Sequence, residues 1–267
     1  MAFKLLRKAL TSREASVLPE DDDIREVPPP LECTQAEIDR WNEEWIEYLG
    51  REWMHQFIPH DQLPQKPPLP DDPMDMLRLS VSPGWELGLY CDRDALEDKV
   101  VMEMGCGCGG LAKQVARYTR TYLGTDYSTL ALMVARLVSP ANCTYTHVGD
   151  RQGLHWFFGQ IDTVVSRHFW IHQNMLQAGR NLDFLALFLK PGGRLYADFY
   201  WPNPAVEQFI VRSPDEPLSK RWPSATFHYQ PEDVSRLIAG RPFRVLREAV
   251  SLETQRRYVV LERLSDR

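Results

Sequence analysis

A glycine-rich turn is the part of the sequence best suited to ligand chemistry. An apolar run over residues 99–104 is followed by Gly105-Cys106-Gly107-Cys108-Gly109-Gly110 and then by a helical pattern over 111–118. Glycine adopts positive φ without steric cost and lets the backbone approach a ligand closely. The helix that follows presents free N–H groups to electronegative atoms. The pattern therefore predicts a strand that carries Glu103 near its end, a ligand-binding turn and a helix.

A second acidic residue follows in the next apolar run. Asp126 ends the run over 121–126, where a carboxylate can bind ribose hydroxyl groups. Gly105, Gly107 and Gly110 also satisfy the spacing G-x-G-x-x-G, which is typical of dinucleotide-binding folds. These two segments predict a ligand of the adenosine type, and they leave open whether it is a nicotinamide dinucleotide or S-adenosylmethionine.

Short apolar runs alternate with helical patterns beyond residue 98. This alternation predicts parallel βαβ units with ligands at the carboxyl ends of the strands. The expected strands are 99–104, 121–126, 143–148, 161–166, 194–200, 243–248 and 258–261, and the expected helices are 111–118, 130–138, 181–189 and 231–238. The fold class is therefore predicted to be α/β: a doubly wound, mostly parallel, seven-stranded Rossmann-like sheet with helices on both faces and an N-terminal helical cap. The last two strands are spaced like a closing hairpin.

Five ordered segments resemble the class I S-adenosylmethionine-dependent methyltransferases. The first is Glu103-x-Gly105-x-Gly107-x-Gly109, which resembles their first motif. The others are Leu123-Gly124-Thr125-Asp126-Tyr127-Ser128, Val148-Gly149-Asp150, Ile161-Asp162-Thr163-Val164-Val165-Ser166 and Leu189-Lys190-Pro191-Gly192-Gly193-Arg194-Leu195. The resemblance covers about residues 99–200, and a nicotinamide enzyme is not expected to show the last three segments together. It implies S-adenosylmethionine as cofactor and S-adenosylhomocysteine as product.

The resemblance also implies roles for single residues. Glu103 would face the methionine amino group, and Asp126 would accept hydrogen bonds from both ribose hydroxyls. Asp150 would accept from the adenine amino group. The remaining expected cofactor contacts are Gly105, Cys106, Gly107, Gly109, Tyr127, Arg151 and Arg167. A structural alternative stays open for the two aspartates, because Asp is also common in turns.

Two histidines follow the fourth expected strand, in the segment 166–174. His168 and His172 would lie at the carboxyl edge of the sheet, and His172 falls at the second histidine of a Leu-His-His-type segment of many small-molecule methyltransferases. A histidine that titrates near neutrality can act as a general base, which methyl transfer needs only if the acceptor arrives protonated. Structural hydrogen bonding is the alternative role for either ring. No Asn-Pro-Pro-Tyr-type signature follows this strand, which argues against methylation of DNA bases.

The five cysteines give no metal or disulfide pattern. Their number is odd, and Cys106 and Cys108 together supply only half of a tetrahedral zinc site. We therefore expect no metal site, and small cysteine side chains suit a crowded turn. Reduced thiols favour a cytoplasmic location.

Acidic residues and prolines are concentrated in residues 1–98. Residues 1–98 hold 10 Lys/Arg against 22 Asp/Glu and 11 of the 20 prolines. We expect an acidic, proline-rich extension with a helical cap over 1–98, and a methyltransferase core over 99–267 with a substrate-side insert at about 201–230. Within the first part, Thr34 and Glu37 form a capping-box pattern that opens a helix over 34–57. Its aromatic residues would either pack on the core or form a lid.

These observations predict methyl transfer to a small-molecule acceptor by in-line displacement. The net charge of −6 and the pI of about 5.7 disfavour a duplex nucleic-acid ligand, since such proteins usually carry a basic face. The longest apolar runs are too short to span a membrane. An RNA or protein methyltransferase and a non-catalytic adenosylmethionine-binding subunit remain the alternatives. The sequence does not define an oligomeric state.

Overall fold

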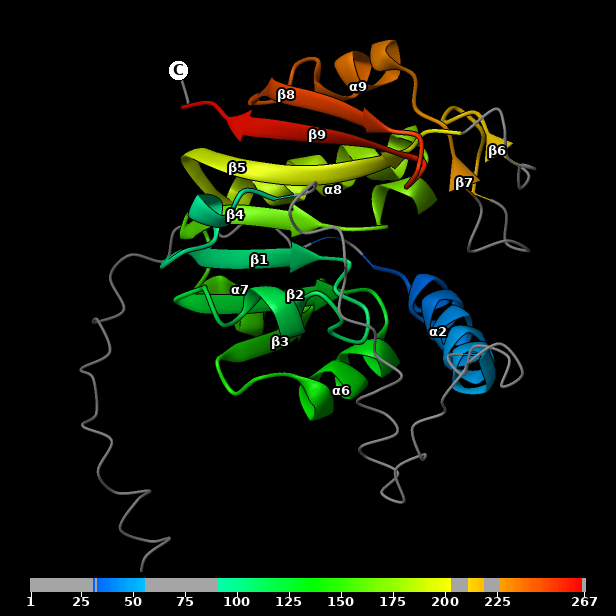
Figure 1. Cartoon of the computed structure of the whole chain (residues 1–267), viewed down its shortest axis with the longest axis vertical. Helices are drawn as coiled ribbons and strands as arrows, with labels where there is room; N and C mark the ends of the chain where they lie inside the picture. The colour runs from blue at the N-terminus through cyan, green and yellow to red at the C-terminus, as the bar shows by residue number, and fades with distance from the viewer. Residues whose placement is uncertain (1–30, 32, 56–90, 203–210, 219–225, 266–267) are drawn as a thin grey trace, which may run out of the picture.

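The computed structural model describes residues 31, 33–55, 91–202, 211–218 and 226–265 (Figure 1). A seven-stranded sheet forms its centre, in the order β3-β2-β1-β4-β5-β9-β8, and β9 alone runs antiparallel to the other strands. The strands are β1 Val100–Met104, β2 Thr121–Asp126, β3 Cys143–His147, β4 Ile161–Ser166, β5 Leu189–Tyr200, β8 Phe243–Ser251 and β9 Arg256–Arg263. The predicted mostly parallel, seven-stranded sheet is confirmed, as is the hairpin at its end.

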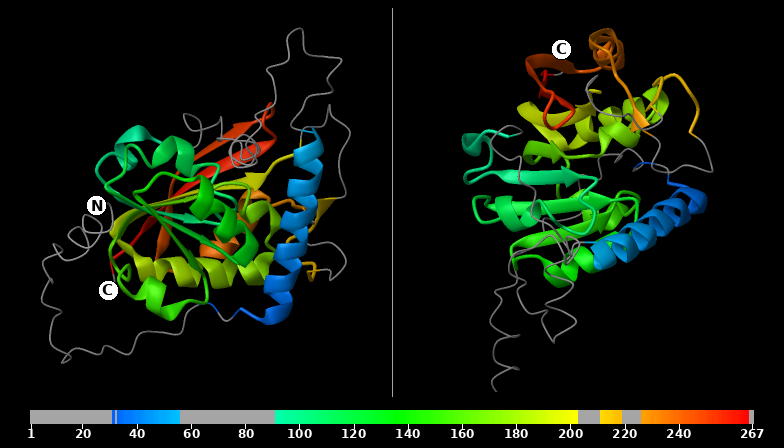
Figure 2. Two further views of the ribbon diagram at one scale, coloured as in Figure 1. Left: turned by 90° about the horizontal axis from the view of Figure 1, so that it is seen from below. Right: turned by 45° about the vertical axis from the view of Figure 1, so that its right-hand side comes forward.

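Helices cover both faces of this sheet (Figure 2). Neighbouring residues of a strand point to opposite faces, and β1 shows this because Met102 packs in the core with α8 while Val101 packs in the core with α5 and α6. A strand that is buried on both faces reads as a continuous apolar run, which is why these strands are visible in the sequence. The helices are α2 Gln35–His55, η1 Arg93–Ala95, α5 Ala112–Val115, α6 Thr129–Val138, α7 Arg151–His155, η2 Trp170–His172, α8 Met175–Phe188 and α9 Pro231–Ile238.

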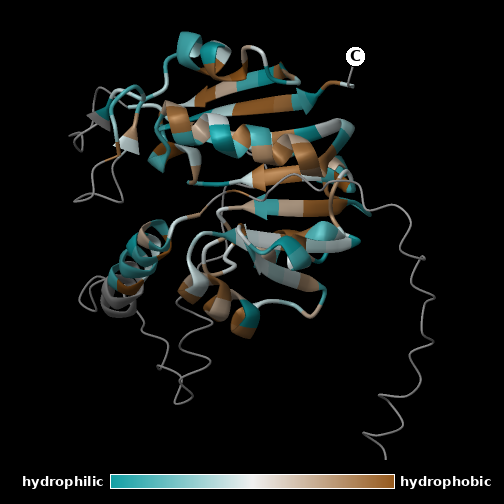
Figure 3. Cartoon of the chain, turned by 180° about the vertical axis from the view of Figure 1, so that it is seen from behind, coloured by the Kyte–Doolittle hydropathy of each residue, from teal (hydrophilic) through white to brown (hydrophobic). Residues whose placement is uncertain are grey.

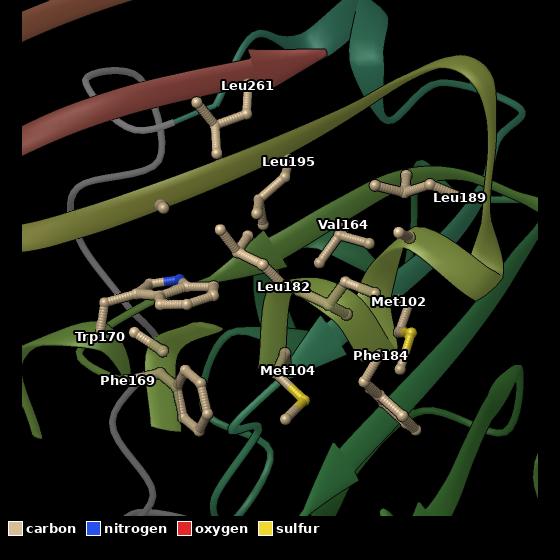
Figure 4. Close-up of a cluster of buried hydrophobic side chains, with 14 of the residues drawn as sticks. Met102, Met104, Val164, Phe169, Trp170, Leu182, Phe184, Leu189, Leu195 and Leu261 are labelled. Atoms are coloured by element: carbon tan, nitrogen blue, oxygen red, sulfur yellow. The ribbon is translucent and has the colours of Figure 1, made fainter. Parts of the chain in front are cut away.

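The larger core lies between the sheet and α8. Met104, Val164, Leu182 and Leu195 meet there (Figure 4). In Figure 3 apolar residues follow the strands, whereas α2 is mostly hydrophilic. Within the part of the chain that the structure describes, no helix combines the length and apolar character needed to cross a membrane.

Several elements differ from the sequence-based expectation: α5 covers only part of the expected 111–118, and β8 and β9 are longer than the expected 243–248 and 258–261. Helix α8 begins at Met175 rather than near 181, because Asn174 caps it by accepting a hydrogen bond from the Gln177 amide. Strand β5 begins at Leu189, and the expected Pro-Gly-Gly turn is an irregularity within it, where the pairing with β4 shifts between Ile161 and Thr163.

Helix α2 crosses the carboxyl edge of the sheet beside α6 (Figures 1 and 2). The predicted capping box is confirmed: the Thr34 amide donates to Glu37 Oε2 at 2.9 Å, and the Glu37 amide donates to Thr34 Oγ1 at 3.3 Å. The Asn42 side chain joins the helix to the first turn of α6. The helical cap therefore forms, while the domain boundary near 98 stays a prediction. Residues 1–30 lie outside the described residues, and so does half of the expected insert at 201–230, namely 203–210 and 219–225. The described part of the insert includes the two-stranded sheet of β6 Val211–Arg212 and β7 Thr226–Phe227.

The packing of α8 gives a direct test of this fold. Leu182 is 1% exposed in the main core, whereas Leu176 of the same helix is 70% exposed. We expect Leu182→Ala to lower the free energy of unfolding by about 2–5 kcal/mol, because it removes buried apolar surface and leaves a cavity. Leu176→Ala is the control and should change it by about 0.5 kcal/mol or less. Urea denaturation measures both, and equal effects would contradict the assigned burial.

Candidate active site

The strand order places a cavity at the carboxyl ends of β1, β2 and β4. Connections leave β1 and β4 toward opposite faces of the sheet, and ligands of open α/β sheets bind at such a crevice. The cavity has a volume of about 260 Å³. Its described lining comes from three loops and from α2: Trp41, Glu44, Trp45, Glu103, Gly105, Cys106, Gly107, Cys108, Gly110, Leu111, Asp126, Tyr127, Arg167, His168, Phe169 and His172.

The turn after β1 requires its glycines. Gly105 and Gly107 have φ values of 74° and 51°, which favour glycine. A Cβ on Gly105 would lie 2.4 Å from the Phe169 ring, and one on Gly107 would lie 2.3 Å from the Trp45 ring. The Gly105 amide donates to the Thr125 carbonyl at 2.8 Å, which ties the turn to β2. The backbone of this turn therefore forms one wall of the cavity.

Glu103 is buried at the end of β1, where it faces the cavity. It accepts a hydrogen bond from the Tyr122 hydroxyl. Burial raises the pKa of Glu103 to about 8, although Tyr122 and the nearby charge of Arg167 act in the opposite direction. Glu103 is therefore largely protonated at pH 7, and a cationic ligand group beside it would favour the carboxylate form.

Asp126 ends β2 and is also buried. Its Oδ2 accepts from the Gly107 amide at 2.9 Å, and its Oδ1 accepts from the Ser128 amide at 2.8 Å. Burial raises the pKa of Asp126 to about 6, against the effect of these amides. Each carboxylate oxygen has a second lone pair, so Asp126 can hold the turn and still accept from a hydroxyl of a ligand.

The loop after β4 brings His168 to the cavity in a strained conformation. His168 has a φ of 56°, which is uncommon for a residue other than glycine. Its amide donates to Oδ1 of the fully buried Asp198 at 2.7 Å, and Arg256 Nε donates to Oδ2 of the same carboxylate at 3.1 Å. Partial desolvation lowers the pKa of His168, and the charges of Arg256 and Arg167 act in the same direction, so its ring is neutral at pH 7. The ring is nevertheless 42% exposed, and its Nε2 lies 4.0 Å from Asp198 Oδ2.

Comparison with known proteins agrees with this arrangement. A family model described as "Methyltransferase domain" matches residues 101–193, which include the three loops that line the cavity. This match covers about a third of the chain and identifies a methyltransferase domain there. A search of curated protein sequences finds no match.

Solved structures show the same fold at low sequence identity. A SAM-dependent methyltransferase from Methanosarcina mazei is 16% identical, with a TM-score of 0.50 over 69% of this chain and 100% of that one. The magnesium protoporphyrin IX methyltransferase of Synechocystis PCC 6803, determined with bound SAH, is also 16% identical, with a TM-score of 0.51 over 85% of this chain and 97% of that one.

Nine of the twelve expected site residues of the methyltransferase line the cavity. Gly109, Asp150 and Arg151 do not. A Cβ on Gly109 would meet Ser139 Oγ at 2.6 Å, so this glycine serves packing against the end of α6. Asp150 caps α7, since its Oδ1 accepts from the Gly153 amide at 3.0 Å. An adenine contact by Asp150 therefore stays a prediction, to be tested separately.

Tyr127 lines the cavity and also anchors a neighbouring helix. Its hydroxyl donates to Asn181 Oδ1 at 2.7 Å, and its ring is nearly parallel to that of Phe169, with centroids 6.4 Å apart. An adenine ring beside Tyr127 would thus meet a side chain whose position is fixed.

Part of the lining of the methyltransferase site was not singled out from the sequence. Trp41 and Trp45 of α2 are among the aromatic residues for which a lid was one of two expectations, and both line the cavity. Glu44 of the same helix and Phe169 of the loop after β4 had no expected role. The turn also contributes Cys108, Gly110 and Leu111.

The two cysteines of the turn show no sign of metal chemistry. Burial raises the pKa of the Cys106 and Cys108 thiols well above the usual range, so both are protonated at neutral pH. Among the residues described here, no group of three or more metal-ligating side chains occurs.

Asp198 provides a stability test for the methyltransferase. We expect Asp198→Ala to lower the free energy of unfolding by about 3–5 kcal/mol, because it leaves Arg256 and the His168 amide without their buried partner. Asp183→Ala is the matched control: Asp183 binds Arg241 in an ion pair and is itself 58% exposed, so its loss should cost about 1 kcal/mol or less. Equal losses for the two variants in urea denaturation would show that Asp198 does not hold this loop.

Proposed function

We propose that the methyltransferase transfers the methyl group of S-adenosylmethionine to a small-molecule acceptor in the cavity under α2. The observation that carries this proposal is the placement of two buried carboxylates, Glu103 and Asp126, on either side of the glycine turn. A site with two buried acids whose pKa values are raised suits a ligand that brings positive charge and hydroxyl donors.

The residues present fit the cofactor in three respects. Gly105 and Gly107 line the cavity with backbone atoms alone, beside the Phe169 and Trp45 rings that pack on these two positions. Asp126 would accept from the ribose hydroxyls, and Glu103 would bind the ammonium group of the methionine part. Arg167 lies close enough to Glu103 for its charge to act to lower the pKa of Glu103. The guanidinium group of Arg167 would suit the methionine carboxylate.

The chain would contribute alignment and proton acceptance to the reaction. When bound, S-adenosylmethionine supplies a methyl group on a sulfonium, a good leaving-group system. Holding the acceptor in line with that group supplies much of the rate. The lowered pKa of His168 makes its neutral ring a weak base, although the ring can still accept a hydrogen bond from an acceptor hydroxyl. His172 lies on the same wall, and of the two histidines it is the proposed base for an acceptor that arrives protonated.

The shape and charge of the cavity support a small acceptor. Trp41, Trp45 and Phe169 give aromatic walls, and among the described lining residues Arg167 is the one Lys or Arg. A site for RNA needs a basic surface that tracks phosphates, and the described lining offers none. The magnesium protoporphyrin IX methyltransferase with a similar fold acts on a small molecule, which agrees with this proposal.

Binding of the cofactor is the first test. We expect calorimetry to show binding of S-adenosylmethionine and S-adenosylhomocysteine but not of NAD. Asp126→Ala should weaken the affinity by at least about 100-fold, since charge-assisted hydrogen bonds contribute about 1.5–3 kcal/mol each. Asp126 also holds the turn, so circular dichroism must confirm that the variant folds, and Asp126→Asn is the milder second variant.

Two further variants sharpen this experiment. Asp215→Ala, on an exposed ion pair far along the chain, should leave binding unchanged. Asp150→Ala decides whether the predicted adenine contact exists, because its loss would weaken binding only if the carboxylate reaches the ligand. Binding of NAD instead, or unchanged affinity in the Asp126 variants, would overturn the assigned cofactor site.

The pH dependence of binding tests the role of Glu103. The pKa of Glu103 is about 8 without a ligand, and pairing with an ammonium group lowers it, so binding releases a proton below pH 8. The affinity for S-adenosylhomocysteine should therefore rise from pH 6 to pH 7.5, by at most about tenfold per pH unit, and level off near pH 8, where Glu103 is already a carboxylate before binding. Above the pKa of the ligand amine, loss of the ammonium charge should lower the affinity again. Calorimetry in buffers of different ionisation enthalpy measures the released proton. Glu103→Gln should abolish this proton release, and an equal release in the variant would assign it to another group.

A further inference from the structure

Helix α2 contacts each of the three loops that line the cavity. The Trp41 ring lies edge-on to the His172 ring after β4, with centroids 6.2 Å apart. Asn42 binds the first turn of α6 after β2. Trp45 lies against Gly107 in the turn after β1, where a Cβ would be 2.3 Å from its ring. The helix therefore forms the fourth wall of the site.

Trp45 occupies space on the wall that the proposed cofactor would use. Its indole packs on Gly107, whose amide donates to Asp126. Both residues also line the cavity. A ligand that reaches Asp126 along the glycine turn must therefore contact the Trp45 ring or displace it.

Asn42 fixes α2 in this position. Its Oδ1 accepts from Ser128 Oγ at 2.8 Å and from the Leu130 amide at 3.1 Å, so it shares the capping of α6 with Ser128. Ser128 also donates its amide to Asp126. Ser128 thus links α2 to Asp126, the carboxylate that we propose binds the ribose.

We propose that Trp45 contacts the cofactor and that Asn42 is the residue that positions Trp45. The cofactor then enters and leaves only when the Asn42 hydrogen bonds break. This inference rests on the proposed function and adds a mechanism by which the cofactor site opens. With these contacts made, α2 is in the closed position, so the apparent association rate is reduced by the small fraction of open molecules. The same contacts slow dissociation after binding.

Stopped-flow fluorescence with S-adenosylhomocysteine as the probe tests this gate. We expect Asn42→Ala to raise the association and dissociation rates together, by about tenfold each, which corresponds to about 1.4 kcal/mol of closing free energy. The dissociation constant should change by less than about threefold. A merely structural role for Asn42 would weaken binding without faster association, so the rate of association is the decisive readout.

Matched variants separate the gate from general destabilisation. Asn142→Ala removes another asparagine cap, a 2.7 Å hydrogen bond to the Ala116 carbonyl, and should leave both rates unchanged. Trp45→Ala should speed exchange and also weaken binding, whereas Trp45→Phe should retain most of the affinity and remains informative if the alanine variant does not fold. If the wild type binds and the Asn42→Ala rates stay within twofold, the gate is refuted and the proposed function stands. If the wild type binds neither S-adenosylmethionine nor S-adenosylhomocysteine, the proposed function fails first.

Discussion

The carboxylate of Asp126 is the interaction on which the site depends. It is buried where β2 ends, and its two oxygens accept from backbone amides of two different loops, at Gly107 and at Ser128. Without a charged acceptor, both amides would lack a partner in a region that excludes water, which is costly. The pKa of about 6 means that the charge is present at neutral pH and is lost in acid. The turn after β1 and the start of α6 are therefore set by the same group that is placed to meet a ligand.

The sheet supplies the remaining geometry. Because β1 lies between β2 and β4, the loops that follow these three strands emerge side by side at one edge, and their connections diverge to opposite faces. The divergence leaves a hollow, and α2 covers it through contacts with each loop. Asp198 plays a comparable part at the end of β5, since it holds the His168 amide while Arg256 balances its charge. Strained backbone at His168 persists because these partners over-determine it.

Sequence analysis reached those features that local patterns encode. Buried strands read as apolar runs, and a positive φ beside a ligand wall demands glycine, so the sheet and the turn from Gly105 to Gly107 could be predicted. Asp126 and Asp150 show the limit: each follows an apolar strand, yet one faces the cavity while the other caps α7. Asp198 lies inside an apolar strand, and its partners are 30 and 58 residues away. Such pairings depend on tertiary contacts, which no local pattern records. The same holds for the packing of the Trp45 ring on Gly107.

The electrostatics of the cavity differ between its two sides. Burial raises the pKa values of Glu103 and Asp126, so enclosure disfavours negative charge on their side. A cationic ligand relieves this on the side of the two carboxylates, where its charge restores theirs. The pKa of His168 is lowered by partial desolvation and by Arg256 and Arg167, although its side chain is 42% exposed. On the side of His168 and the tryptophans, the acidic residue of the described lining is Glu44, whose charge acts on the pKa of Arg40 against the larger, lowering effect of burial. For the acceptor proposed above, this side offers the aromatic walls of Trp41, Trp45 and Phe169.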